Sequence, residues 1–142
     1  MPVSQLKVVI YMHQIKRTGV SRFYYATKYS MQGIKAAWIE EPAFRYEVGA
    51  LVVMVPGAIW LAESGIQLAL MLGCCFLVLA FEIVNSAIEA VVDRWGPEYH
   101  ELAGRAKDMG SAAVFMMLNM TWIIWAGIAW DNGYLDFIKG FF

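Results

Sequence analysis

The side chains best suited to chemistry recur at helical spacing near the end of a long apolar stretch. Glu82, Asn85, Ser86 and Glu89 stand at positions i, i+3, i+4 and i+7, so a helix would carry them on one face. That face combines two carboxylates, an amide and a hydroxyl. Ionisable residues are costly within a membrane span and usually serve a function there. We interpret this polar face as functional; hydrogen bonds between helices, or contact with water, are the alternative.

Further groups that suit phosphates and metal ions lie in the segment 93–108 and around the start of the first apolar stretch. Lys and Arg offset charge on a transferring phosphoryl group, and Mg²⁺ takes one or two carboxylates plus phosphate oxygens. The groups are the cations Arg105 and Lys107, the carboxylates Glu40, Glu41, Glu47, Glu98, Glu101 and Asp108, and the donors Tyr99 and His100. Ordinary cytoplasmic loops have a similar composition, and a histidine such as His100 is more often structural than catalytic. The sequence has no GxxxxGK[ST] motif and no protein-kinase motif set, which disfavours the familiar nucleotide folds.

The composition of the 142-residue chain is that of a membrane protein. Hydrophobic residues make up 60% and charged residues only 16%, which is too apolar for an ordinary water-soluble fold. The 11 basic and 12 acidic residues nearly cancel, so no overall basic field favours nucleic acid. The adjacent Cys74 and Cys75 suit neither a disulfide framework nor a metal site, because both need spaced ligands.

Three apolar stretches, at residues 44–62, 66–92 and 109–130, are each compatible with the ~20 residues that an α-helix needs to cross a bilayer. The first is the weakest, because Pro56 and Gly57 interrupt it. We therefore predict an all-α integral membrane protein, a single membrane domain over residues 1–142, with a cytoplasmic loop at 93–108.

Basic residues predict which ends of the spans face the cytoplasm. Lys7, Lys16, Arg17, Arg22, Lys28, Lys35 and Arg45 precede or open the first span, Arg94, Arg105 and Lys107 follow the second, and Lys139 follows the third. The positive-inside rule places the N-terminus and the loop 93–108 in the cytoplasm. The turn near residues 63–65 and the tail 131–142 are then expected outside.

The segment 18–40 mixes the basic residues Arg22, Lys28 and Lys35 with aromatic and aliphatic side chains. This pattern is typical of a basic amphipathic helix that lies on the cytoplasmic leaflet. A solvated linker is the alternative.

Two long segments resemble the signature of the prokaryotic diacylglycerol kinase family. They are residues 82–94 (EIVNSAIEAVVDR) and 98–111 (EYHELAGRAKDMGS). Residues 18–22 (TGVSR) and 35–47 (KAAWIEEPAFRYE) also resemble the Gram-negative branch of that family. The similarity covers residues 18 to 130 approximately.

The resemblance implies a homotrimer of three-span protomers with an N-terminal surface helix, located in the bacterial inner membrane. It implies that ATP, with Mg²⁺, phosphorylates diacylglycerol to phosphatidic acid in sites at subunit interfaces on the cytoplasmic side. By the family pattern, Glu82 is the general base, Asn85 and Glu47 support it, and Glu41 and Glu89 hold Mg²⁺. The residues matching ATP contacts are Arg22, Tyr29, Glu98, Tyr99, His100, Lys107 and Asp108. Those matching the lipid side are Arg22, Ser30, Lys35, Trp38, Arg45, Glu47, Trp60, Glu82 and Ser111.

The chain departs from the family pattern beside Glu41. Glu40 stands where a neutral polar residue is expected, and Pro42 follows Glu41. A residue that precedes proline is biased away from helical backbone. We therefore expect Glu41 to lie outside regular helix.

Three other functions fit parts of the sequence. An undecaprenol kinase would share the catalytic signature, but the resemblance at residues 18–22 favours diacylglycerol. A small proton-coupled transporter would explain carboxylates in a membrane, although transport sites usually lie near the bilayer midplane, whereas the acidic groups here gather at the expected cytoplasmic end. A non-catalytic scaffold would leave the polar face without a purpose.

Overall fold

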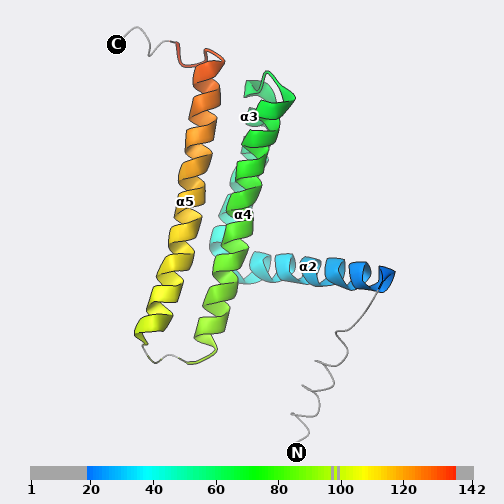
Figure 1. The fold of residues 1–142 in the computed structure, drawn as a ribbon, viewed down its shortest axis with the longest axis vertical. Coiled ribbons are helices and arrows are strands. Elements are labelled where there is room, and N and C mark those ends of the chain that lie inside the picture. Colours follow the sequence, from blue (N-terminus) through cyan, green and yellow to red (C-terminus); the bar gives the residue numbers. More distant parts are fainter. Residues whose placement is uncertain (1–18, 97, 99, 137–142) are drawn as a thin grey trace, which may run out of the picture. The chain divides into compact units, whose positions relative to one another are not determined.

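The residues that the computed structural model describes, 19–96, 98 and 100–136, form four α-helices and no strand. These are α2 (Val20–Glu40), α3 (Pro42–Leu61), α4 (Gly65–Asp93) and α5 (Glu101–Asp131), labelled in Figure 1. The chain divides into two compact units, of which the first ends at Lys35 and the second begins at Ala36. The all-α prediction is confirmed for the described residues, and the single-domain organisation stays a prediction.

Helix α2 begins in the first unit, where aromatic side chains contact one another along it. The ring of Tyr25 lies edge-on to that of Tyr24, with 5.3 Å between centroids, and 6.2 Å from the ring of Tyr29. Phe23 and Met31 are exposed by 77% and 59%. The segment is therefore a helix with large, exposed apolar side chains. Its location on a membrane surface stays a prediction.

The junction between α2 and α3 is fixed by Pro42 and Arg45. Proline suits the first helical position because it has no N–H to leave unpaired. Glu41, which precedes it, has extended backbone (φ −107°, ψ 106°), so the expected break at Glu41 is confirmed. The Arg45 Nη1 atom donates to the carbonyls of Trp38 (2.8 Å) and Ile39 (3.0 Å), which satisfies acceptors at the end of α2. The Glu41 side chain makes no capping hydrogen bond and keeps its carboxylate for other partners.

Helix α4 is the central helix of the second unit, since it packs against both α3 and α5. The core of this packing is formed by Ala58, Met71 and Ile128, one residue from each helix. The Trp125 indole N–H donates to the carbonyl of Met71 at 3.3 Å. Side chains from all three helices thus pack together near the end of α4 that follows α3.

Side-chain amides fasten the same end of the second unit. Ser64 caps α4 by accepting from the Gln67 N–H at 3.2 Å. The Gln67 amide donates to the Asn132 side-chain oxygen at 2.8 Å, and the Asn132 amide donates to the Leu61 carbonyl at 2.7 Å. The turn between α3 and α4 is therefore tied to the end of α5.

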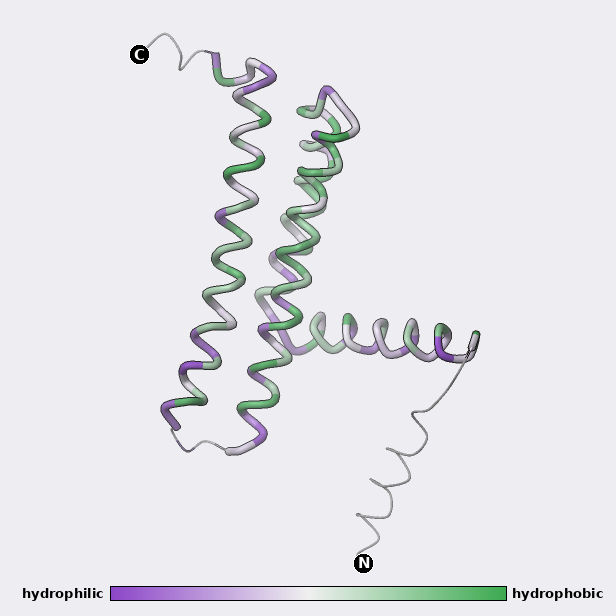
Figure 2. The backbone as a smooth tube through the Cα atoms, viewed as in Figure 1, coloured by the Kyte–Doolittle hydropathy of each residue, from purple (hydrophilic) through white to green (hydrophobic). Residues whose placement is uncertain are grey.

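The helices α3, α4 and α5 are each long and apolar enough to cross a membrane. Figure 2 shows hydrophobic residues along most of their length and hydrophilic ones where α4 and α5 approach their connection. At 1.5 Å per residue the 29 residues of α4 extend for about 44 Å, which exceeds a ~30 Å hydrocarbon core. Apolar side chains such as Val53 (74%) and Ile123 (72%) are largely exposed, as expected of surfaces that face lipid or another membrane subunit. The chain is a multi-pass membrane protein.

The start of α5 differs from the expected loop at 93–108. Helix α5 already begins at Glu101, well before Met109, so only residues 94–100 connect it to α4. Hydropathy marks the part of a helix that lies in lipid, whereas the helix itself begins at its cap. The His100 Nδ1 atom is that cap, because it accepts from the Leu102 N–H at 3.2 Å, and Glu101 places negative charge in the first turn.

Candidate functional site

The polar face predicted on α4 is present and is partly buried. Glu82 is only 5% exposed, although it lies on a helix whose surroundings are mostly apolar. The neighbouring Ser86 hydroxyl donates to the Glu82 backbone carbonyl at 2.9 Å, so it serves the helix and leaves the Glu82 carboxylate to other partners. Keeping a carboxylate out of water costs free energy, and ionisable residues that are retained in such positions commonly have a function.

Asn85 and Glu89 form a pair one turn further along α4. The Asn85 Nδ2 atom donates to Glu89 Oε1 at 3.1 Å. This hydrogen bond fixes one carboxylate oxygen of Glu89 and leaves the second oxygen free of that bond. The pair is suited to present a carboxylate ligand in a defined orientation.

Four carboxylates are gathered at this end of the second unit. Glu41 and Glu89 lie close enough to Glu82 to repel it electrostatically, and Glu82 in turn repels Glu47. The Glu47 Oε2 atom is buried and has no hydrogen-bond partner among the described residues. Mutual repulsion and an unpaired buried oxygen favour the binding of a cation or a proton donor. We call Glu41, Glu47, Glu82 and Glu89 the carboxylate cluster.

Glu41 and Glu89 fit Mg²⁺ by their chemistry. Mg²⁺ is usually held by one or two carboxylates and completes its coordination with water and substrate phosphates. Within the described ranges, no group of three or more His, Cys, Asp or Glu side chains is arranged to hold a metal ion. Two carboxylates are enough for a Mg²⁺ ion whose other ligands are water and phosphate oxygens.

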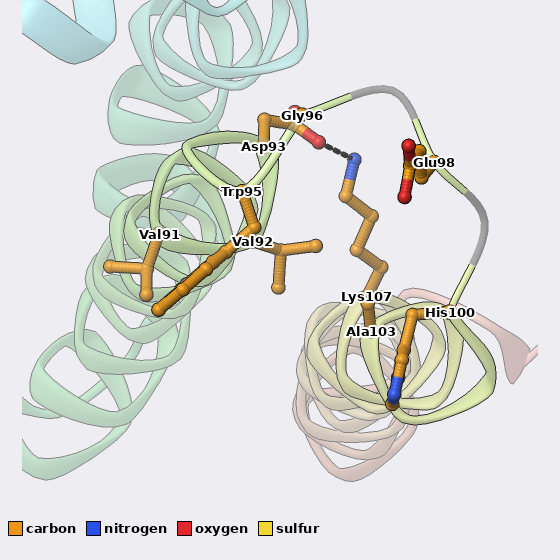
Figure 3. A pocket seen from close by; sticks show the side chains of 10 residues that line it. Val91, Val92, Asp93, Trp95, Gly96, Glu98, His100, Ala103 and Lys107 are labelled. Atoms are coloured by element: carbon orange, nitrogen blue, oxygen red, sulfur yellow. Dashed lines mark hydrogen bonds and ion pairs between the residues drawn. The ribbon is translucent and has the colours of Figure 1, made fainter.

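A pocket of about 610 Å³ lies where α4 ends and α5 begins (Figure 3). Lys107 reaches across it from α5, and its ammonium nitrogen lies 2.5 Å from Asp93 Oδ1 at the end of α4. Lys107 is also within electrostatic reach of Glu89, which connects the pocket to the carboxylate cluster. The lining residues are Val91, Val92, Asp93, Trp95, Gly96, Glu98, His100, Ala103, Gly104 and Lys107. A cation beside an apolar wall, with Trp95 among the lining residues, suits a nucleotide.

The structure brings together two groups of the predicted site residues. Glu41, Glu47, Glu82, Asn85 and Glu89 belong to the carboxylate cluster or contact it. Glu98, His100 and Lys107 line the pocket, whereas Asp108 is exposed on the first turns of α5 and does not line it. Tyr99 lies outside the described residues.

The remaining predicted residues are more dispersed. Arg22, Tyr29, Ser30 and Lys35 are on the part of α2 that belongs to the first unit, and all four are exposed. Arg22 lines a shallow pocket there with Gly19, Phe23 and Ala26.

Within the second unit, Trp38 and Arg45 share the α2–α3 junction, and Ser111 is exposed on α5. Trp60 lies near the end of α3, about 20 Å along the helix from Glu47. There its ring packs on that of Tyr134 with 5.0 Å between centroids.

Sequence reasoning missed Asp93 as a site residue. It was assigned only to the start of the loop, although it lies eleven positions after Glu82 and four after Glu89, which keeps it on the polar face. Extending the helical period by one more turn would have found it. Gly96 and Ala103 also line the pocket, but small residues give no such signal in the sequence.

The chain is thus a multi-pass membrane protein with a partly buried carboxylate cluster, in which Glu82 is the buried member, and a pocket that contains a lysine at one end of its long apolar helices. The family model for prokaryotic diacylglycerol kinase matches residues 28–129. The chain belongs to the prokaryotic diacylglycerol kinase family. The matched range contains the carboxylate cluster, Asn85 and the whole pocket.

Curated relatives from Gram-negative bacteria are similar over nearly their full length. A diacylglycerol kinase of Haemophilus influenzae is 48% identical over 113 residues, which are 80% of this chain and 96% of the relative. One of Escherichia coli K12 is 50% identical over 115 residues, or 81% and 94% of the two chains. One of Pseudomonas aeruginosa is 47% identical over 112 residues, or 79% and 91%. The resemblance expected from the sequence is confirmed.

Proposed function

We propose that this chain is an ATP-dependent lipid kinase that phosphorylates diacylglycerol to phosphatidic acid. The observation that carries the proposal is the buried Glu82 carboxylate, which lies among other carboxylates in a chain of this family. A lipid hydroxyl needs a base to take its proton, and a nucleotide needs cations and a pocket. The second unit contains a carboxylate that can act as the base, and a pocket that contains the cation Lys107.

Glu82 acts as the general base. In the reaction, the lipid hydroxyl oxygen forms a bond to the γ-phosphorus of ATP, and the bond from that phosphorus to the ADP oxygen breaks. The hydroxyl proton passes to a Glu82 carboxylate oxygen, which supplies a positioned acceptor as the bond forms. Holding the two reactants in line and offsetting the charge on the phosphoryl oxygens lower the barrier further.

Glu41 and Glu89 would hold Mg²⁺, which supplies positive charge to the nucleotide phosphates when bound. Asn85 keeps Glu89 in orientation through the 3.1 Å hydrogen bond. Lys107 brings a second positive charge to the same region, since it lies near both Asp93 and Glu89. Glu98 and His100 line the nucleotide pocket. Arg22, Tyr29, Tyr99 and Asp108 complete the proposed ATP contacts.

The lipid side is proposed to include Glu47, which borders a small apolar cavity of about 60 Å³ between α3, α4 and α5. Its unpaired buried oxygen can accept a hydrogen bond from a glycerol hydroxyl. Trp38 and Arg45, at the α2–α3 junction, are also proposed to contact the lipid. Arg22, Ser30, Lys35, Trp60 and Ser111 are further proposed lipid contacts.

The protein is proposed to function as a homotrimer in the inner membrane, with its N-terminus and the α4–α5 connection in the cytoplasm and its C-terminus in the periplasm. The distribution of Lys and Arg supports this orientation. Exposed apolar side chains on α3 and α5 support contacts with lipid or with other copies. Helix α2, with basic and aromatic residues, is proposed to lie on the cytoplasmic leaflet.

The test is Mg²⁺-dependent transfer of radiolabelled γ-phosphate from ATP in mixed micelles, to diacylglycerol and separately to undecaprenol. We expect label in phosphatidic acid, and little on undecaprenol. Label on undecaprenol alone would assign the chain to an isoprenoid alcohol. If folded protein labels neither lipid, the kinase proposal fails for both substrates.

A further inference from the structure

Gly110, on the buried side of α5, lies directly against the Asn85 side chain of α4. A Cβ added at Gly110 would collide with Asn85 Oδ1, and it would stand 3.4 Å from Asn85 Cγ and 3.6 Å from Ile88 Cδ1. The added Cβ and Asn85 Oδ1 would be closer together than non-bonded carbon and oxygen atoms can lie. The amide therefore occupies the space that a side chain at position 110 would need.

The two ends of the Asn85 amide have different surroundings. Its Nδ2 atom donates to Glu89 Oε1 at 3.1 Å, whereas its Oδ1 atom is buried and has no hydrogen-bond partner among the described residues. An unpaired buried acceptor costs free energy. A flipped amide would be worse, because its oxygen would then face the Glu89 carboxylate. The observed orientation requires room for the oxygen beside α5, and Gly110 provides that room.

We infer that Gly110 is a positioning residue for the carboxylate cluster. The absence of a side chain at this point of α5 lets the Asn85 amide oxygen approach the helix closely while its N–H is directed at Glu89. The inference rests on the proposed function, because it assigns to Glu89 the binding of a divalent cation together with ATP. A larger residue at position 110 would turn or displace Asn85, and Glu89 would lose the donor that orients it.

Other glycines on these helices provide matched controls. Gly127 lies on the same helix as Gly110, and a Cβ there would meet nothing within 4 Å. Gly73 on α4 is equally open. Gly127→Ala adds the same methyl group as Gly110→Ala but does not crowd a neighbour. Because alanine is a better helix former than glycine, the control should not weaken the helix.

The experiment measures Mn²⁺ binding, by electron paramagnetic resonance, to purified protein in micelles with a non-hydrolysable ATP analogue. We expect Gly110→Ala to weaken Mn²⁺ binding about tenfold or more, as loss of an outer-shell partner commonly does, and Gly127→Ala to leave it unchanged. The apparent KM for Mg²⁺ in the kinase assay should rise in parallel. Wild-type Mn²⁺ affinity in folded Gly110→Ala protein would overturn the inference.

A double-variant cycle separates positioning from general loss of packing. Asn85→Ala removes both the donor to Glu89 and the oxygen with which the new methyl group collides. We therefore expect Asn85→Ala/Gly110→Ala to bind Mn²⁺ no more weakly than Asn85→Ala alone, so the two effects are not additive. A further tenfold loss in the double variant would contradict the inference.

The cycle also covers the case in which Gly110→Ala does not fold. The double variant lacks the collision and should fold as Asn85→Ala does; failure to fold would then overturn the inference. If wild-type protein neither binds Mn²⁺ with the nucleotide nor phosphorylates a lipid, the proposed function fails. If wild-type protein does both and Gly110→Ala matches Gly127→Ala, the positioning role alone fails.

Discussion

At the scale of single residues, Lys107 lies between two acidic neighbours on α4. Its ammonium group contacts Asp93 at 2.5 Å and is within electrostatic reach of Glu89. The Lys107 side chain is 36% exposed and the Asp93 side chain 65%, so water screens their attraction. Under the proposed contact between Lys107 and ATP, a nucleotide phosphate would displace Asp93 from Lys107 at small cost, and Asp93 would compete with the nucleotide for that cation.

This competition predicts the effect of Asp93→Asn. Because water screens an exposed ion pair and leaves it weak, we expect the KM for ATP to fall about two- to fivefold. Lys107→Gln should raise the KM, since it removes the cation itself. Steady-state kinetics over a range of ATP concentrations measures both, and the difference between Asp93→Asn and wild type should shrink in high salt. A KM that rises in Asp93→Asn would mean that Asp93 orients Lys107 for the nucleotide.

At the scale of elements, the α2–α3 junction depends on Arg45. Its guanidinium donates to two carbonyls at the end of α2, and Glu41 of the carboxylate cluster lies between the two helices. The family resemblance suggested a lipid contact for Arg45. The structure gives the side chain a partner within the chain, and the two roles make different predictions.

We expect Arg45→Ala to lower the free energy of unfolding in micelles by about 0.5–1.5 kcal/mol, because two exposed carbonyls exchange a charged donor for water. The measurement is reversible unfolding with denaturing detergent, with Lys28→Ala on the exposed part of α2 as the control for loss of a basic residue. A raised KM for the lipid with unchanged stability would instead support a direct lipid contact.

Periodicity and hydropathy predicted the helices and the α4 polar face from particular residues. The spacing of Glu82, Asn85 and Glu89 was sufficient, because helical geometry depends only on position along the chain. The non-helical Glu41 followed from Pro42. The start of α5 could not be predicted in this way, because the His100 cap depends on a local backbone conformation rather than on hydropathy.

Contacts between helices could not be predicted in the same way. That Asn85 faces Gly110, or that Lys107 reaches Asp93, depends on how α4 and α5 pack. A single sequence carries no direct record of that packing. The pocket between them combines small residues and charges that only the folded connection brings together.

At the scale of the whole molecule, long apolar surfaces and one charged end determine how the chain meets a membrane. The proposed orientation puts the connection that contains Arg94 in the cytoplasm and the turn that contains Glu63 in the periplasm. We expect a membrane-impermeant maleimide, applied to intact cells, to label Glu63→Cys and not Arg94→Cys. Cys74 and Cys75 are buried and would be replaced by alanine first. The opposite labelling pattern would reverse the topology and move the carboxylate cluster away from cytoplasmic ATP.

In the proposed reaction, Glu82 accepts the proton of the lipid hydroxyl. The test compares Glu82→Gln, which keeps the shape of the side chain, with Glu63→Gln in the turn that precedes α4, far from the carboxylate cluster. Phosphate transfer to diacylglycerol and binding of the ATP analogue are measured on each folded variant. We expect Glu82→Gln to lose a factor of about 100 or more in kcat while it still binds the nucleotide, and Glu63→Gln to resemble wild type. A wild-type kcat in Glu82→Gln would show that Glu82 is not the base.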